Sequence, residues 1–197
     1  MRTSGNSGAA QDAALPSLVM RRGPEPLPSL TLPPGVRLRV FEEGWGPAAW
    51  EHVVNTAFGR DFTFDGKMRA EPAYRPERIL FLEQGGAPCG HRHVSSCIVA
   101  VAAAWQRDKW PPGTGYLHYV AVLPEARGNG LGYWVSLAAL HQMRREGNSR
   151  ALLETQDERL PAIKTYLKLG FVPDLEGHES YKARWEEIMA QLNGGHP

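Results

Sequence analysis

This 197-residue chain has few cysteines, almost no net charge and no long apolar run. Two cysteines are too few for a disulfide framework, and no apolar run is long enough for a transmembrane helix. The longest apolar stretch near the N-terminus is interrupted by Pro16 and Ser17, which argues against a secretory signal. A formal charge of +1 gives no reason to expect nucleic acid or a membrane as the main partner. We therefore expect a cytoplasmic protein.

The chain divides by composition near Val36. Residues 1–35 are rich in glycine, alanine, serine and proline, and such a segment buries too little apolar surface to offset the entropy of ordering it. Residues 18–22 could add a short strand, but we expect most of residues 1–35 to be a mobile N-terminal extension. Residues 36–197 are long enough for one domain with a sizeable core.

Apolar residues recur with regular periods from Val36 onward. Alternation predicts a strand at residues 36–40, and helical spacing predicts a helix from Pro47 to Gly59. A short helix is expected at residues 65–70, and a longer one after Gly130. Further strands are expected at residues 79–82, 98–105, 116–122, 152–155 and near Ser180. Strands first, then alternating helices and strands, predict a mixed α/β sheet with helices on both faces.

The run from Val120 to Gly132 carries the strongest functional signal. It reads as a buried strand, then Arg127, then glycines at alternate positions, then a long helix. Glycines let a backbone approach a ligand closely, and a helix N-terminus attracts anions. Arg127 adds a permanent charge that can bind phosphate oxygens. The sequence therefore predicts a phosphate-binding site, with a ligand-free glycine turn as the alternative.

Spacing distinguishes the possible phosphate ligands. A P-loop needs Gly-Lys-Ser/Thr where Leu131 and Gly132 stand, and a dinucleotide fingerprint needs glycine at Tyr133. The pattern Arg/Gln-x-x-Gly-x-Gly/Ala matches at Arg127, Gly130 and Gly132. Through this pattern the chain resembles the GNAT superfamily of acyl-coenzyme A-dependent acyltransferases.

A second stretch, Leu152 to Pro173, resembles another hallmark of the same superfamily. It reads as a strand, a short helix with Ala162 and Tyr166 on one face, then Leu-Gly-Phe. Pro161 suits the first helical turn and Gly170 suits its end. Many family members have Asn where this chain has Arg159, so the cofactor contact usually assigned to that Asn is in doubt.

The resemblance, which begins near Val36, implies a GNAT-like fold and acetyl-coenzyme A as cofactor. The fold is a central, mostly antiparallel mixed sheet of six to seven strands. Its fourth and fifth strands, counted from Val36, splay apart into a V-shaped opening that receives pantetheine. The cofactor-binding residues that the resemblance implies are Val120, Ala121, Val122, Arg127, Gly128, Asn129, Gly130, Leu131, Gly132 and Ala162.

The resemblance also implies catalytic roles. Tyr166 would give a proton to the departing thiolate, although helical spacing equally predicts a core tyrosine beside Ile163 and Leu167. Strand alternation places Tyr116, His118, Val120 and Val122 on one face. His118, titrating near neutrality, would take the amine proton; a histidine hydrogen-bonded within the sheet is the alternative. Glu154 and Asp157 are weaker candidates for the base.

The acceptor site is expected beside the loop that follows Trp105. Weak substrate-binding candidates are Trp105, Asp108 and Tyr116. Phe62 and Phe64 could add an aromatic wall that receives an amine by cation–π contact, with ordinary hydrophobic anchoring as the alternative.

One cluster of metal-binding residue types does not predict a metal site. Cys89, His91, His93 and Cys97 lie within nine residues, but their spacing matches no common zinc site. We expect an insertion between strands and no metal.

The favoured function is an N-acetyltransferase that moves acetyl from acetyl-coenzyme A to a primary amine of a small molecule or peptide, leaving coenzyme A as product. The alternatives are a non-catalytic acyl-coenzyme A-binding regulatory module, or acetylation of a protein or tRNA amine. A nearly neutral chain disfavours the tRNA substrate. A homodimer is compatible with the resemblance, but no residue proves one.

Overall fold

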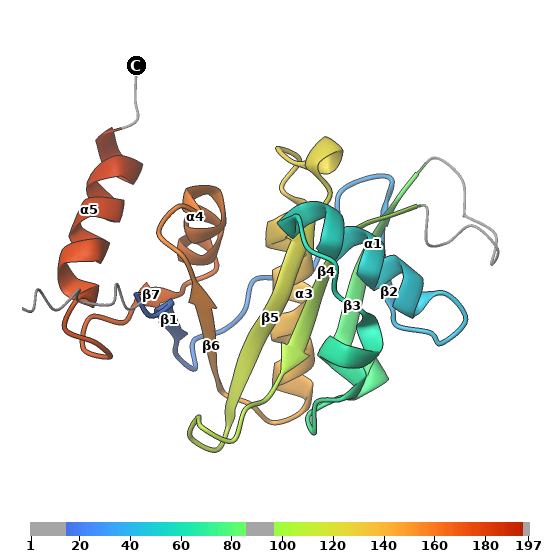
Figure 1. Cartoon of the computed structure of the whole chain (residues 1–197), viewed down its shortest axis with the longest axis horizontal. Helices are drawn as coiled ribbons and strands as arrows, with labels where there is room; N and C mark the ends of the chain where they lie inside the picture. The colour runs from blue at the N-terminus through green and yellow to red at the C-terminus, as the bar shows by residue number, and fades with distance from the viewer. Residues whose placement is uncertain (1–14, 86–96, 195–197) are drawn as a thin grey trace, which may run out of the picture.

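The computed structural model describes residues 15–85 and 97–194, which contribute to one seven-stranded sheet. The strands lie in the order β2-β3-β4-β5-β6-β1-β7 (Figure 1). Every neighbouring pair is antiparallel except β5 and β6, which confirms the expected mixed, mostly antiparallel sheet. The strands are β1 Leu18–Arg22, β2 Val36–Val40, β3 Ile79–Gln84, β4 Ile98–Trp105, β5 Thr114–Val122, β6 Arg150–Thr155 and β7 Val172–Pro173.

Helices cover both faces of the sheet. Helix α1 lies in front of β4 and β5 in Figure 1, and α3 lies behind them. Helix α1 has a proline in its first turn and ends at Gly59, whose φ of 61° is the left-handed conformation that glycine adopts readily. The helices are α1 Gly46–Phe58, α3 Leu131–Arg145, α4 Leu160–Lys168 and α5 Tyr181–Gly194, with short turns η1 Asp65–Arg69, η2 Pro76–Arg78 and η3 Pro124–Ala126.

The parallel pair β5 and β6 separates after three residue pairs. Thr114 faces Arg150, and the last pair joins Tyr116 to Leu152. Strand β5 nevertheless continues to Val122 along β4, so its other edge has no described partner strand beyond Tyr116. The structure therefore has the splayed opening that the fold prediction required, between the strands labelled β5 and β6.

A β-bulge lies in β5 next to this opening. Ala103 of β4 pairs with His118, and Val101 pairs with Ala121, so two steps on β4 correspond to three on β5. Tyr119 within the bulge has a φ of 45°, a left-handed conformation that is uncommon outside glycine.

The bulge changes which side chains share a face. Tyr116 and His118 lie on the same face as Ala121, because their partners on β4 alternate regularly. Val122 pairs with Ala100 and therefore lies on the opposite face. The prediction that strict alternation holds from Tyr116 to Val122 is wrong beyond His118, because it allowed no extra residue in the strand.

The N-terminal segment contributes a strand to the sheet. β1 lies between β6 and β7, and pairs with both. Leu18 and Met20 are fully buried, and the Arg22 guanidinium donates to the carbonyl oxygen of Leu169 at 2.8 Å. The short strand that the sequence allowed at residues 18–22 is therefore present, and its apolar side chains are buried in the core.

The strand expected near Ser180 is also corrected. Residues 181–194 form α5, whose buried side chains Tyr181, Trp185 and Ile188 recur at helical spacing. The Tyr181 hydroxyl donates to the carbonyl oxygen of Ser17, and Arg184 donates to that of Pro16. Helix α5 thus fixes the residues just before β1. Among the described residues, no helix is long and apolar enough to cross a membrane.

These contacts predict that β1 is needed for stability. Met20→Ala should lower the free energy of unfolding by about 2–5 kcal/mol, because it leaves a cavity at a fully buried position. Chemical denaturation followed by circular dichroism measures this change. Ser29→Ala, on the exposed segment after β1, is the control and should have little effect. Equal stability of Met20→Ala and wild type would show that β1 contributes no packing.

Candidate active site

A cavity of about 330 Å³ lies where β5 and β6 separate. Strand β5 contributes its residues 116–120, and β6 contributes Glu154 and Thr155. The end of α1 and the segment after it form a second wall, and α4 provides Tyr166. The lining residues are Ser17, Phe58, Arg60, Phe62, Arg107, Tyr116, Leu117, His118, Tyr119, Val120, Glu154, Thr155, Gln156, Arg159 and Tyr166.

A series of packed aromatic rings supports the bulge next to this cavity. The Tyr119 ring packs edge-on against Trp50 of α1, with 5.0 Å between ring centroids. Trp50 in turn packs edge-on against Phe64 at 5.7 Å, and Phe64 stacks on Phe41 at 5.0 Å. Trp50 is fully buried and Phe64 nearly so. The uncommon conformation of Tyr119 is therefore fixed by close packing.

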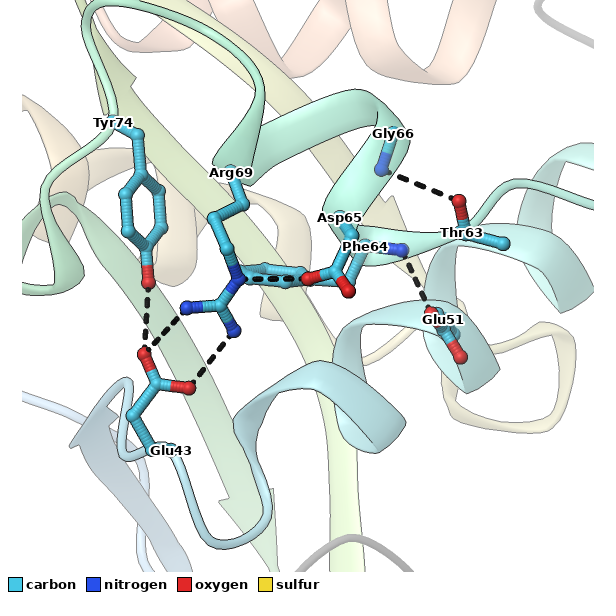
Figure 2. A network of polar contacts seen from close by, with 8 residues as sticks. All are labelled: Glu43, Glu51, Thr63, Phe64, Asp65, Gly66, Arg69 and Tyr74. Carbon is cyan, nitrogen blue, oxygen red and sulfur yellow. Dashed lines mark hydrogen bonds and ion pairs between the residues drawn. The ribbon is translucent and has the colours of Figure 1, made fainter.

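A polar network holds the segment after α1 in place (Figure 2). The Arg69 guanidinium donates to both carboxylate oxygens of Glu43 at 2.9 Å, and to Asp65 at 2.7 Å. Tyr74 donates its hydroxyl to the same Glu43 carboxylate. The Glu51 side chain accepts a hydrogen bond from the backbone of Phe64 at 2.7 Å. The Asn55 side chain holds the neighbouring Phe62 by accepting a hydrogen bond from its N–H and donating one to its carbonyl oxygen, both at 2.9 Å.

Tyr166 lies on α4 with its ring edge-on to Phe171. The side chain is 8% exposed, yet it lines the cavity. Burial raises the pKa of Tyr166 to about 12, although the charge of Arg159 acts in the opposite direction. The phenol is protonated at neutral pH, as in an ordinary tyrosine, and burial makes its proton harder to remove. Pro161 in the first turn and Gly170 after the last, both expected, set the limits of this helix.

His118 lies among aromatic rings rather than in an open polar setting. Its ring centroid is 4.0 Å from that of Tyr119 and 5.0 Å from that of Tyr116. Burial, together with the charge of Arg107, lowers the pKa of His118 to about 3, although Glu154 acts in the opposite direction. The structure thus differs from the expectation of titration near neutrality, because the surrounding rings exclude water from the charged form.

Glu154 of β6 is the centre of a polar cluster at the far side of His118. Its carboxylate accepts hydrogen bonds from Lys109 at 2.7 Å and from the Tyr116 hydroxyl at 2.8 Å. Arg107 lies 3.7 Å from the same carboxylate. Burial raises the pKa of Glu154, but the bonds from Lys109 and Tyr116 and the nearby charges outweigh it, so the pKa is lowered overall. Burial and the bond to Glu154 raise the pKa of Tyr116.

The predicted phosphate-binding residues form one loop before α3, which we call the glycine loop (residues 127–132). Gly128 and Gly130 have φ values of 84° and 71°, and no side chain caps the N-terminus of α3. Arg127 is exposed and donates long hydrogen bonds to the carbonyl oxygens of Val122 and Ala57. Backbone donors, a helix N-terminus and a guanidinium form a donor set suited to a diphosphate.

Several predicted acceptor residues do not line the cavity. Trp105 is 1% exposed, although its ring lies 6.3 Å from His118. Asp108 is exposed on the turn after β4 and is not part of the lining. The faces of the two phenylalanines already hold cations of this chain, Lys67 over Phe62 and Arg69 over Phe64. This arrangement favours anchoring over recognition of an amine by Phe62 and Phe64.

The cavity also contains residues that sequence reasoning did not predict. Arg60 and Arg107 line it, and Ser17 reaches it because β1 lies beside β6. A basic residue in a long loop carries no spacing signal, so only the fold places these side chains. The cluster of Cys89, His91 and His93 lies outside the described residues.

Residues 52–171 match the Acetyltransferase (GNAT) family. The chain belongs to the GNAT acetyltransferase family. This GNAT chain is 32% identical over 154 residues to a mycothiol acetyltransferase from Thermomonospora curvata, covering 74% of this chain and 47% of the relative. It is 31% identical over 176 residues to a mycothiol acetyltransferase from Nocardioides sp., covering 83% and 60%. The chain thus spans about half the length of the curated relatives it matches.

Solved structures share the same GNAT fold. A GCN5-related N-acetyltransferase from Sphaerobacter thermophilus has a TM-score of 0.60 at 22% identity, covering 81% of this chain and 50% of that one. The ribosomal-protein-S18-alanine N-acetyltransferase from Escherichia coli has a TM-score of 0.53 at 19% identity, covering 70% and 77%. At these identities the likeness shows the fold alone.

The buried position of His118 predicts an unusual titration. Followed by NMR, its ring should stay neutral at about pH 5, where an unperturbed histidine is mostly protonated. Arg107→Gln should raise its pKa, because a neighbouring positive charge is removed.

The same shift has a consequence for stability. Since the unfolded chain takes up this proton near pH 6.5 and the folded chain does not, the wild type should lose stability relative to His118→Gln as the pH falls below about 6.5. His118→Gln also assigns the NMR signal. A midpoint between about pH 6 and 7 would contradict the burial argument.

Proposed function

We propose that this chain transfers an acetyl group from acetyl-coenzyme A to a primary amine of a small molecule or peptide. The observation that supports it best is one continuous arrangement along β5. The glycine loop follows the end of β5, and the unpaired edge of β5 borders the separation from β6. Tyr166 and His118 line the cavity at this separation. Family membership supports the same reaction class.

The described residues fit the cofactor. Residues 127–132 would bind the diphosphate through backbone N–H groups and the Arg127 guanidinium. Val120, Ala121 and Val122 would offer backbone groups to the pantetheine, because the β6 side of β5 has no described partner strand beyond Tyr116. Ala162 lies one helical turn before Tyr166 on α4, where it would pack against the pantetheine. When bound, acetyl-coenzyme A supplies a thioester that an amine can attack directly.

Arg159 replaces the asparagine expected from the resemblance. Its guanidinium lies over the Phe58 ring, 5.0 Å from the ring centroid, and it lines the cavity. We infer that this contact holds Arg159 at the cofactor side of the cavity, where its charge complements the diphosphate. A guanidinium cannot act as an acceptor, so it would not replace the amide contact atom for atom.

Tyr166 would hold the proton that the departing sulfur requires. Its phenol is protonated at neutral pH, as an ordinary tyrosine is, and burial raises its pKa further. The side chain lines the cavity. A donor that stays protonated until a thiolate forms matches the need of this reaction.

We infer that His118 would accept a hydrogen bond from the attacking amine, because a ring whose pKa is lowered so far is a weaker proton acceptor than a histidine that titrates near neutrality. Its ring is neutral because burial lowers its pKa, so the ring has an acceptor nitrogen over the whole neutral range. The two alternative carboxylates are already occupied. Glu154 accepts hydrogen bonds from Lys109 and Tyr116, and Asp157 accepts two from Arg184.

The glycine loop gives a matched test of cofactor binding. Gly128 and Gly147 both have a φ of 84°, and a Cβ added to either would meet nothing within 4 Å. Alanine at either position should therefore cause similar backbone strain, of order 1 kcal/mol or somewhat more. Only Gly128→Ala should weaken coenzyme A binding, measured by calorimetry, because Gly147 lies beyond the far end of α3. Equal affinity of the two variants would remove the loop from the site.

The role of Tyr166 is tested by removing only its hydroxyl. Tyr166→Phe should lower kcat about 100-fold, the scale of a general acid, and should leave coenzyme A affinity nearly unchanged. Release of coenzyme A over a panel of amines measures this. Tyr133→Phe, on the first turn of α3, is the control and should retain activity. A turnover number equal to that of the wild type would assign Tyr166 to packing.

A further inference from the structure

Three arginines line the cavity, against a single carboxylate among the described lining residues. They are Arg60, Arg107 and Arg159, and the carboxylate is Glu154. Glu154 already accepts hydrogen bonds from Lys109 and Tyr116. An acceptor that carries only positive charges would therefore be repelled by the arginines and would find no free carboxylate to bind it.

One part of this positive charge belongs to the cofactor side. Arg159 lies over the Phe58 ring, and the neighbouring Ala57 accepts a hydrogen bond from Arg127 of the glycine loop. Arg60 follows on the same segment. Arg159 and Arg60 therefore lie near the end of α1 that Arg127 contacts, which places them on the cofactor side of the cavity.

Arg107 lies elsewhere. It comes from the turn after β4 and contacts Tyr116, the residue at which β5 and β6 are still paired. Its guanidinium carbon is 4.4 Å from the centroid of the Tyr116 ring. This is the opposite end of β5 from the glycine loop, so the charge of Arg107 is separate from the cofactor arginines.

The Arg107 guanidinium has hydrogen-bonding capacity to spare. Its distance of 3.7 Å from Glu154 is too long for a hydrogen bond, and among the described residues it donates none. Its side chain is 36% exposed, so a ligand can reach it. A guanidinium presents a planar, forked set of donors that matches an oxyanion in two-point contact. The Tyr116 ring beneath it, fixed by the bond to Glu154, holds that plane in place.

We propose that the acceptor amine also bears an oxyanion, a carboxylate or phosphate group, which Arg107 binds at the end of the cavity opposite the glycine loop. The inference rests on the proposed acetyl transfer and names its substrate class. Lys109 forms an ion pair with Glu154 at 2.7 Å, and its positive charge offsets the repulsion between this carboxylate and the incoming anion. The acceptor is then held by its anion at Arg107, with its amine directed toward His118 and Tyr166.

Paired acceptors that differ only in the anion test the proposal. Lysine is compared with cadaverine for the carboxylate, and phosphoethanolamine with ethanolamine for the phosphate. The wild type should favour the anionic member of at least one pair by about 10-fold or more in kcat/KM, the scale of a charge-assisted contact. The preferred pair identifies the anion. Acetyl transfer with no preference for either anionic member would overturn the proposal.

Variants connect that preference to Arg107. Arg107→Gln should lower the ratio of kcat/KM within the preferred pair toward one, and Arg107→Lys should keep part of it, since charge remains without the fork. Arg60→Gln, a cavity arginine on the cofactor side, should leave the ratio unchanged. Circular dichroism verifies that each variant is folded. A ratio unaffected by Arg107→Gln would also overturn the assignment, whereas absence of transfer to every amine would count against the proposed function instead.

Discussion

The site depends on the end of pairing between β5 and β6. A parallel pair that continued to Val122 would satisfy the backbone of β5 on both edges and would fill the cavity with β6 side chains. Pairing instead stops at Tyr116 and Leu152. Strand β6 then pairs with β1 on its other edge from Ala151 to Thr155, so it keeps its place in the sheet where it no longer pairs with β5.

The bulge at Tyr119 lies in the unpaired part of β5, and it is maintained by packing on the other side of the sheet from α3. A left-handed residue other than glycine costs of order 1–3 kcal/mol, and the surrounding structure must offset that cost. The edge-on contact between Tyr119 and the fully buried Trp50 can offset this cost, because a buried aromatic pair contributes stabilising free energy beyond that of the apolar area it buries. The Arg69 network holds Phe64 against Trp50 and so extends this support to the surface (Figure 2).

Local signals in the sequence predicted the elements that local physics controls. Proline in the first turn and glycine at the end defined α1 and α4, and the glycine loop before α3 lies where its spacing indicated. The bulge was not predictable, because nothing in the residues around Tyr119 forces an extra residue into a strand. The pairing of β1 with β6 is likewise a long-range contact. The sequence allowed a strand at residues 18–22, but the surrounding proline-rich composition gave no sign of its partner. Helix α5 did have a signal, the helical spacing of Tyr181, Trp185 and Ile188.

Burial explains why the chemistry of the site differs from that of its residue types in water. A histidine in the sequence suggests titration near neutrality, but rings of Tyr116 and Tyr119 beside His118 remove the water that would stabilise its charge. Burial likewise raises the pKa of Tyr166 above that of an ordinary tyrosine, which is already protonated at neutral pH. Burial raises the pKa of Glu154, but the hydrogen bonds from Lys109 and Tyr116 outweigh it and lower the pKa overall. The cavity therefore combines a neutral histidine and a protonated phenol with charged groups near Glu154 and near the glycine loop, and the rings beside the bulge account for the neutral histidine.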